Sequence, residues 1–368
     1  MNNHPVSLYI HIPFCEAICD YCDFPKLQYF RIFAEKYLIK LEKEIKSYKI
    51  GNDLKTIYIG GGTPTSLDDD LFEKLLKMVE PYAKSVEEYT VEANPESLSL
   101  NKLKLMKQYG VNRLSIGVES SDDKILKAIN RHHTFKDVKI AIVNAVKVGF
   151  DNINVDLILG LPNALKPQLK KDLDNLLSLP ISHISCYSLS IHPHTAFYLK
   201  GITEQNSDIE RELYDYVEEH LKEVGFIHYE ISNWAKPGKE SIHNYTYWKD
   251  EPYYGVGLGA SGYVGNVRYT NTFSINKYLE GQTIQEKEEV SLNDDKEYFL
   301  MLNLRTIRGI ILVEYQERFN EDFYEKNKDK IDHYIQDGLM LWSKDQTSLY
   351  LSYSGMMILD TILLELIK

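Results

Sequence analysis

Three of the four cysteines in this 368-residue chain lie within eight residues, at the spacing Cys15-x3-Cys19-x2-Cys22. Closely spaced thiolates hold zinc or iron–sulfur clusters. A structural zinc ion needs four protein ligands, and His11, one strand-length away, is the nearest candidate for the fourth. An iron–sulfur cluster with three protein thiolates instead leaves one iron open. The remaining cysteine, Cys186, lies in the apolar run HISCYSLSI and is interpreted as a buried structural thiol.

An open iron on such a cluster is chemically useful because it can bind the amino and carboxylate groups of S-adenosylmethionine (SAM). The SAM sulfonium can then accept an electron from the cluster, and the protein supplies position and electrostatics for this chemistry. We therefore favour the cluster over zinc.

Six short apolar segments, rich in β-branched residues and tyrosine, are typical of strands. They cover residues 7–12, 55–61, 88–94, 113–119, 153–160 and 183–190. Segments with helical periodicity, such as 33–48 and 71–83, lie between them. This alternation predicts an α/β fold with a parallel sheet and right-handed crossovers.

The polar motifs favour a barrel over an open, doubly wound sheet. The cysteine loop, the GGGTPT run at 60–65, Glu92, Glu119 and Asp156 all fall at or near the carboxyl ends of successive strands. Barrels of this kind build their sites at that end. We predict an incomplete (β/α)6 TIM-like barrel in which these groups converge on one pocket.

The pattern changes beyond residue 200, and we predict three parts: the partial barrel at 1–200, a connecting region at 201–290 and a C-terminal domain at 291–368. Residues 226–270, rich in Tyr, Trp, Gly and Asn, are interpreted as a loop region. The run LMLWSKDQTSLYLS predicts two strands around a turn between amphipathic helices. The C-terminal domain is therefore expected to be α+β and winged-helix-like.

The formal charge of −12 disfavours nucleic acid as the main partner, since phosphate binding requires a basic face. The first residues lack the pattern of a signal peptide. The apolar run GMMILDTILLELI is interrupted by Asp360 and Glu365 and is too short to span a bilayer. We expect a cytoplasmic protein without a transmembrane segment, and peripheral membrane contact through an amphipathic surface remains open.

The segment CEAICDYC matches the CxxxCxxC signature of the radical SAM superfamily. The runs YIHIPFC, GGGTPT, VEANPE, RLSIGVES and VDLILGLP resemble the branch that contains oxygen-independent coproporphyrinogen III oxidase and its heme chaperone relatives. The resemblance covers nearly the whole chain. It implies a 4Fe–4S cluster bound by Cys15, Cys19 and Cys22, with SAM on the open iron and an electron donor as partner; whether SAM is cleaved remains open.

The same resemblance implies a set of SAM contacts in this chain. They are Tyr9, Tyr21, Gly61, Gly62, Thr63, Glu92, Glu119, Arg131 and Asp156. Read individually, the glycines could form an ordinary turn, the tyrosines could pack in the core and the arginine could lie on the surface. Glu119 departs from the branch, which usually has glutamine there; the carboxylate keeps an acceptor for ribose hydroxyls but loses the amide donors.

The heme chaperone relatives bind heme and pass it to an acceptor protein, whereas the oxidase decarboxylates two propionates of coproporphyrinogen III. Three features of this sequence favour a resemblance to the chaperones. Phe24 stands where the oxidase has a further cysteine, only fourteen residues precede Cys15, and HNYTYW at 243–248 matches the chaperone signature HNxxYW. A radical SAM enzyme with another substrate is a third alternative.

The HNxxYW resemblance implies heme contacts at four positions: His243, Asn244, Tyr247 and Trp248. A neutral imidazole can bind heme iron, and aromatic rings can pack on the porphyrin. From chemistry alone, His243 and Asn244 could equally satisfy backbone groups in an aromatic segment. His192, His194 and His228 are competing iron ligands.

Overall fold

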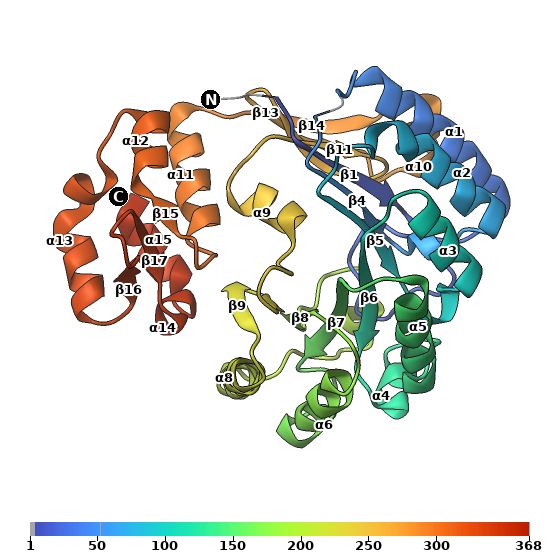
Figure 1. Ribbon diagram of the computed structural model, residues 1–368, viewed down its shortest axis with the longest axis horizontal. Helices are drawn as coiled ribbons and strands as arrows, with labels where there is room; N and C mark the ends of the chain where they lie inside the picture. The colour runs from blue at the N-terminus through green and yellow to red at the C-terminus, as the bar shows by residue number, and fades with distance from the viewer. Residues whose placement is uncertain (1–3, 52, 368) are drawn as a thin grey trace.

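The computed structural model describes residues 4–51 and 53–367, and its central feature is a curved sheet (Figure 1). All six predicted strands are present, parallel and adjacent in chain order. They are β1 (Ser7–Ile12), β4 (Thr56–Gly61), β5 (Glu88–Ala93), β6 (Arg113–Glu119), β7 (Ile153–Leu159) and β8 (His183–Ser188). The prediction of a parallel partial barrel is confirmed.

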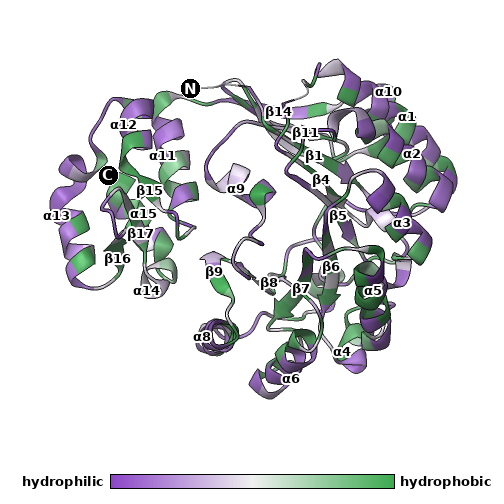
Figure 2. Cartoon of the chain, in the orientation of Figure 1, coloured by the Kyte–Doolittle hydropathy of each residue, from purple (hydrophilic) through white to green (hydrophobic). Residues whose placement is uncertain are grey.

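Helices cover the outer face of this sheet (Figure 1). They are α1 (Arg31–Ser47), α2 (Asp69–Val79), α3 (Leu100–Gln108), α4 (Asp123–Ala128), α5 (Phe135–Val148), α6 (Lys166–Leu177) and α8 (Ser207–Glu223). In α1 the apolar residues Leu38, Leu41 and Ile45 are buried against the strands, as the helical periodicity of residues 33–48 predicts. Apolar residues gather between sheet and helices, while polar residues face outward (Figure 2).

Short elements connect these helices and strands. They are the 3-10 turns η1 (Pro64–Ser66), η2 (Glu80–Tyr82) and η3 (Pro95–Ser97), the strands β2 (Phe14–Cys15) and β3 (Leu27–Gln28), and α7 (Ala196–Leu199). Strands β2 and β3 pair with each other and thereby close the cysteine loop at its base.

The sheet continues beyond the six strands on both edges. One edge adds β11 (Tyr253–Val256), parallel to β1, followed by the antiparallel β12 (Ser261–Val264), β13 (Val267–Asn271) and β14 (Ile284–Glu289). The other adds β10 (Asn233–Ala235) and β9 (Ile227–Glu230). Two short helices, α9 (Ile242–Trp248) and α10 (Ile275–Glu280), complete this part.

The interpretation of residues 226–270 as a loop region is therefore wrong. These strands have three to five residues, and β11 and β12 each contain a glycine, which weakens the signal of a strand in sequence. Gly255 is required by a close backbone approach, because a Cβ there would lie 1.7 Å from the carbonyl oxygen of Ser261.

The last part of the chain packs around its own apolar core, which includes Phe299, Phe323 and Leu349. Its helices are α11 (Leu292–Asn303), α12 (Leu312–Phe319), α13 (Phe323–Gln336), α14 (Tyr353–Met356) and α15 (Leu359–Ile367). Its antiparallel sheet contains β15 (Ile310–Ile311), β17 (Ser348–Leu351) and β16 (Met340–Trp342) in that order. This arrangement matches the predicted α+β, winged-helix-like unit. No helix in the described ranges is long and apolar enough to cross a membrane.

Candidate cofactor site at the carboxyl end of the barrel

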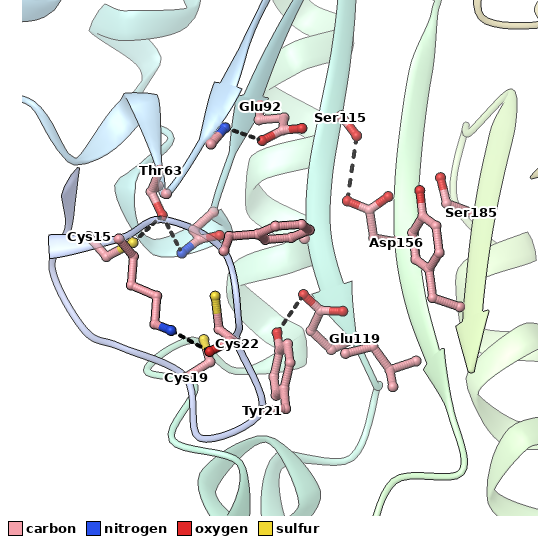
Figure 3. Close-up of a pocket in the computed structure, with 18 of the residues that line it drawn as sticks. Cys15, Cys19, Tyr21, Cys22, Thr63, Glu92, Ser115, Glu119, Asp156 and Ser185 are labelled. Atoms are coloured by element: carbon pink, nitrogen blue, oxygen red, sulfur yellow. Dashed lines mark hydrogen bonds between the residues drawn. The ribbon is translucent and has the colours of Figure 1, made fainter. Parts of the chain in front are cut away.

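A cavity of about 380 Å³ opens at the carboxyl ends of the parallel strands (Figure 3). Most of the residues expected to bind cofactors line it. They are Cys15, Cys19, Tyr21, Cys22, Gly61, Gly62, Thr63, Glu92, Glu119, Arg131, Asp156 and Asn244. Tyr9, His243, Tyr247 and Trp248 are not part of this lining. The prediction that one pocket gathers residues from successive strands agrees with this geometry.

The three cysteines lie on a loop that is fixed at both ends. The amide of Leu27 donates to the carbonyl of Pro13 at 2.6 Å, and the amide of Tyr29 donates to that of Cys15 at 2.8 Å. Within the loop, the Lys26 ammonium donates to the carbonyl of Cys22. The loop thus holds three thiols at the cavity mouth and places a cation beside them.

Burial raises the pKa of the Cys15 thiol to about 11 and that of Cys22 to about 12. These thiols need a positively charged partner to ionise, and iron supplies one when a cluster binds. Within residues 4–51 and 53–367, no three His, Cys, Asp or Glu side chains gather closely enough to hold a single metal ion. In an iron–sulfur cluster each thiolate binds its own iron.

His11 does not complete a zinc site with these cysteines. Its Nε2 lies 2.8 Å from the carbonyl oxygen of Pro25 and its Nδ1 lies 2.9 Å from the Tyr9 hydroxyl, so both ring nitrogens are used. Burial lowers the pKa of this imidazole to about 4, which keeps it neutral. The geometry therefore removes the fourth ligand on which the zinc alternative depended.

The three glycines of GGGTPT are required by close contacts. A Cβ on Gly60 would lie 2.7 Å from the carboxyl carbon of Glu92, and one on Gly62 would lie 2.8 Å from Cys15 Sγ. Gly61 has φ +119°, and a Cβ there would lie 2.7 Å from the His11 ring. The backbone of this loop thus fits directly against the cysteine loop and is more than a turn.

Glu92 lies beneath this glycine loop. Its carboxylate accepts hydrogen bonds from the amide of Gly61 at 2.9 Å and from the Tyr58 hydroxyl at 2.7 Å. Burial raises the pKa of Glu92 to about 7, and the nearby Asp156 carboxylate adds to that effect. A buried acid of this kind can accept from a cationic amino group that enters the cavity.

Glu119 and Arg131 form a buried pair on the opposite wall. Their closest atoms, Arg131 Nη2 and Glu119 Oε1, are 3.3 Å apart, and the Tyr21 hydroxyl donates to Oε1 at 2.9 Å. Glu119 has φ +67°, at a register shift between β6 and β7. Such strain in a non-glycine residue is typical of functional sites. Burial raises the pKa of Glu119 to about 7.

Arg131 is also tied to the cysteine loop. Its Nη1 donates to Asn94 Oδ1 at 3.1 Å and lies 3.6 Å from Cys19 Sγ, while Nη2 donates to the carbonyl of Gly117. The guanidinium therefore joins β5, β6 and the thiols through one planar group.

The cavity floor contains polar residues that the sequence analysis missed. Arg113 is only 2 % exposed, its Nε has no hydrogen-bond partner among the described residues, and the nearest carboxylate, Glu88, lies 3.9 Å away. Asn154 donates to Asp156 at 2.8 Å. Asn154 lies two positions before Asp156 on the same face of β7, so the period of two along that strand was a usable signal.

The HNYTYW motif forms α9, which closes the amino end of the barrel. The carboxylate of Glu88 accepts the amides of Ile242 and His243, each at 3.0 Å. His243 Nδ1 lies 2.7 Å from Thr56 Oγ1 and its Nε2 lies 2.8 Å from the Tyr247 hydroxyl. Burial lowers the pKa of His243 to about 3. The imidazole is thus neutral, enclosed and fully hydrogen-bonded, and it does not reach the cavity.

The other end of the motif faces Glu230 at the end of β9. The Glu230 carboxylate accepts the amide of Ser232, at 3.0 Å, and Asn233 Nδ2, and the nearby Trp248 and Asn244 side chains act to lower its pKa. Burial nevertheless raises the pKa of Glu230 to about 7. The motif therefore connects the barrel floor to the β9–β10 turn.

The Glu230 carboxyl should make the free energy of unfolding depend on pH, and the Glu230→Gln variant should lack this dependence. Burial raises the pKa of Glu230 from about 4.5 to about 7. Between these pH values the folded protein keeps a proton on Glu230 that the unfolded chain has lost, so the contribution of Glu230 to the free energy of unfolding falls as pH rises from 4.5 to 7. We expect the free energy of unfolding of the wild type, relative to the variant, to fall by about 3 kcal/mol between pH 4.5 and pH 8. Urea denaturation at several pH values measures this difference, and a constant difference would contradict it.

Comparison with known proteins identifies the chain. A sequence profile of the radical SAM superfamily matches residues 9–176. "Heme chaperone HemW" of Bacillus subtilis (strain 168) is 38% identical over 95% of this chain and 96% of its own length. The protein of the same name from Lactococcus lactis subsp. lactis (strain IL1403) is 37% identical over 92% of each chain. The chain belongs to the HemW family of radical SAM proteins.

The fold of this HemW-family chain is shared with a solved structure of the oxidase branch. Coproporphyrinogen III oxidase (HemN) from Escherichia coli superposes with a TM-score of 0.83 over 99% of this chain and 90% of its own, at 20% identity. At that identity the likeness concerns the fold, and it supports the partial barrel with its C-terminal unit. Membership of the radical SAM superfamily implies an iron–sulfur cluster and SAM as cofactors.

Proposed function

We propose that this HemW-family chain binds heme and transfers it to an acceptor protein, on a scaffold that holds a 4Fe–4S cluster and SAM. The observation that carries the proposal is the 38% identity to a heme chaperone across nearly the full length of both chains. A position in the cavity lining agrees: Phe24, where the oxidase has a further cysteine, is 63 % exposed at the cavity.

In this proposal Cys15, Cys19 and Cys22, which line the cavity, would hold the cluster and leave one iron for SAM. The SAM contacts follow from position. Glu92 and the backbone of Gly61, Gly62 and Thr63 would receive the amino acid end, while Glu119 and Asp156 would accept from ribose hydroxyls. When bound, the cluster and SAM supply electron transfer and radical chemistry. Tyr9 would act through His11, to which its hydroxyl is bonded.

Arg131 is one of the SAM contacts that the resemblance implies, and its surroundings refine that role. Its two terminal nitrogens already serve Asn94, Gly117 and Glu119. In the proposal Arg131 therefore orients Glu119 and the thiol loop, and the positive charge it places beside Cys19 also favours a carboxylate nearby.

Glu119→Gln tests the contact at which this chain departs from its branch. Because burial raises the pKa of Glu119 to about 7, we expect wild-type SAM affinity to increase by up to about tenfold between pH 6 and pH 8, as the carboxylate gains its charge. The variant should bind SAM with little dependence on pH. Anaerobic equilibrium dialysis of cluster-loaded protein measures both. Parallel pH profiles for the two proteins would show that Glu119 does not contact SAM.

The role of the HNxxYW motif in heme binding stays a prediction. Both ring nitrogens of His243 are hydrogen-bonded, so direct iron ligation would need α9 to move. Among the competing ligands, His228 stacks on Trp234 at 4.1 Å and faces Glu218. His192 lines the cavity with an exposed side chain, and it is better placed to meet a ligand there.

Two assays separate the chaperone from an oxygen-independent coproporphyrinogen III oxidase. Titration of cluster-loaded protein with heme should give a Soret change that saturates at a defined stoichiometry. Anaerobic incubation with coproporphyrinogen III, SAM and a reductant should give no protoporphyrinogen IX. Absence of saturable heme binding, or sustained decarboxylation, would overturn the proposal.

A further inference from the structure

Glu119 reaches the cofactor cavity from a tight turn at the end of β6. The amide of Ser120 donates to the carbonyl of Val118 at 2.8 Å, and Glu119 between them has φ +67°. A hydrogen bond that spans three residues around a positive φ defines a γ-turn of the rare and strained type. Figure 3 shows the Glu119 carboxylate facing the Tyr21 hydroxyl inside the cavity. The position of this carboxylate therefore depends on the contacts that hold the turn in a strained conformation.

The chain that follows the turn is held by Asp172, a buried residue of α6 that is 3 % exposed. Its Oδ1 accepts from the Ser121 amide at 2.7 Å and from the Ser121 hydroxyl at 2.6 Å. The Ser120 hydroxyl donates to the same carboxylate at 3.2 Å, and Gln168 Nε2 donates to it at 2.9 Å. Three of these four donors belong to the two residues that directly follow Glu119.

The two serines also connect this contact to the next helix. The Ser120 hydroxyl accepts the amide of Asp122 at 3.2 Å, and Asp122 is the N-cap residue of α4. Asn175 Nδ2 donates to the Ser121 hydroxyl at 2.8 Å. The segment between the turn and α4 is thus fixed from α6 by Asp172 and Asn175.

The strand before the turn is fixed separately. His133 Nε2 lies 3.2 Å from the carbonyl oxygen of Val118, which is the oxygen that accepts the hydrogen bond of the turn. His133 and Asp172 therefore hold opposite sides of Glu119, and only Asp172 holds the side that leads away from the sheet.

A carboxylate is a costly side chain at this position of α6. Leu169, Leu173 and Leu176 are its buried neighbours on the same helix. Burial raises the pKa of Asp172, and the donors on Ser121 and its other partners counteract that effect. An apolar residue would avoid the desolvation cost. The cost is understandable if the hydrogen bonds of Asp172 have a function at the turn.

We propose that Asp172 is a positioning residue for SAM, because it holds the γ-turn that directs Glu119 into the cofactor cavity. This inference rests on the proposed function, in which Glu119 accepts from the ribose hydroxyls of SAM. Asp172 is not part of the cavity lining, so it acts on SAM through Glu119. Without its carboxylate the turn relaxes, and the Glu119 carboxylate moves away from the ribose.

The test is a double-mutant cycle on SAM affinity, measured by anaerobic equilibrium dialysis of cluster-loaded protein. Its members are the wild type, Asp172→Asn, Glu119→Ala and the double variant. Asparagine conserves the size of the side chain but replaces one acceptor oxygen with a donor, so we expect Asp172→Asn to bind SAM about tenfold more weakly. In the Glu119→Ala background the same change should have no further effect, because the group that Asp172 positions is absent. An equal loss in both backgrounds would overturn the inference.

Asp174→Asn is the matched control, since Asp174 lies on the same helix with an exposed carboxylate 3.4 Å from His220. This variant should bind SAM like the wild type. Iron per chain after reconstitution should equal the wild-type value in every variant, because the cysteine loop is unchanged. A loss of iron together with the loss of SAM affinity would show that Asp172 has a general structural role, and it would contradict the inference.

Ser121→Ala tests the same contact from the other side and applies also if Asp172→Asn does not fold. It removes the hydroxyl that donates to Asp172 at 2.6 Å and leaves α6 unchanged, so we expect SAM to bind about threefold more weakly. If the wild type binds SAM and both variants match its affinity, Asp172 does not position Glu119, although the proposed function stands. If the wild type binds no SAM, the proposed function and this inference both fail.

Discussion

Gly62→Ala is expected to abolish cluster binding while the barrel remains folded. A Cβ at this position would lie 2.8 Å from Cys15 Sγ and 2.9 Å from both the carbonyl oxygen of Phe14 and the carbonyl carbon of Pro13. Two of these three atoms belong to backbone, which cannot move aside as a flexible side chain would. The cysteine loop must therefore shift, and the thiols lose the spacing that a cluster requires.

The measurement is iron and sulfide per chain after anaerobic reconstitution, and we expect less than about a tenth of the wild-type content. Circular dichroism and the thermal midpoint report whether the fold is kept. Gly201→Asn serves as a control: Gly201 has φ +67°, nothing lies within 4 Å of its Cβ position, and asparagine tolerates that conformation. Wild-type iron content in Gly62→Ala would show that the glycine loop does not constrain the cluster.

The glycine run and the carboxylates at the strand ends could be predicted from the sequence as parts of a site. A carboxylate or a glycine run at the end of a buried apolar strand conflicts with its surroundings unless it has a function. Glu92, Asp156 and the glycine run all showed that conflict. The six parallel strands were equally clear, because strands covered on both faces are continuously apolar.

The remainder of the site depends on long-range packing that local patterns do not encode. Arg113 begins a strand and gives no sign that it points into the barrel. The segment around His243 lacks an apolar stripe, because α9 is buried on several sides by polar and aromatic partners such as Thr56 and Tyr58. His243 and Tyr247 were expected at a ligand and lie at the closed end of the barrel, while Asn244 lines the cavity.

Arg131→Ala is expected to destabilise the chain by about 3–5 kcal/mol at pH 8, because it leaves a buried carboxylate without its cation. Glu119 is 8 % exposed, and Arg131 is the guanidinium 3.3 Å from it. Asn94 Oδ1 and the carbonyl of Gly117 would lose a donor as well. The loss should be smaller at pH 6, where the pKa of Glu119, already raised to about 7, lets it take up a proton.

The double variant Glu119→Gln/Arg131→Ala separates the charge effect from the loss of hydrogen bonds. Glutamine still accepts from the Tyr21 hydroxyl but carries no charge, so it should recover about half of the lost stability at pH 8 and little at pH 6. Urea denaturation at both pH values gives the coupling energy. Arg31→Ala, which removes an exposed guanidinium paired with Asp68 and Asp70, should have little effect and serves as the surface control. If Arg131→Ala lowers the free energy of unfolding equally with and without the Glu119 charge, Arg131 acts through its hydrogen bonds to Asn94 and Gly117 alone. In that case these bonds at β5 and β6, rather than the charge pair, hold this wall of the cofactor site.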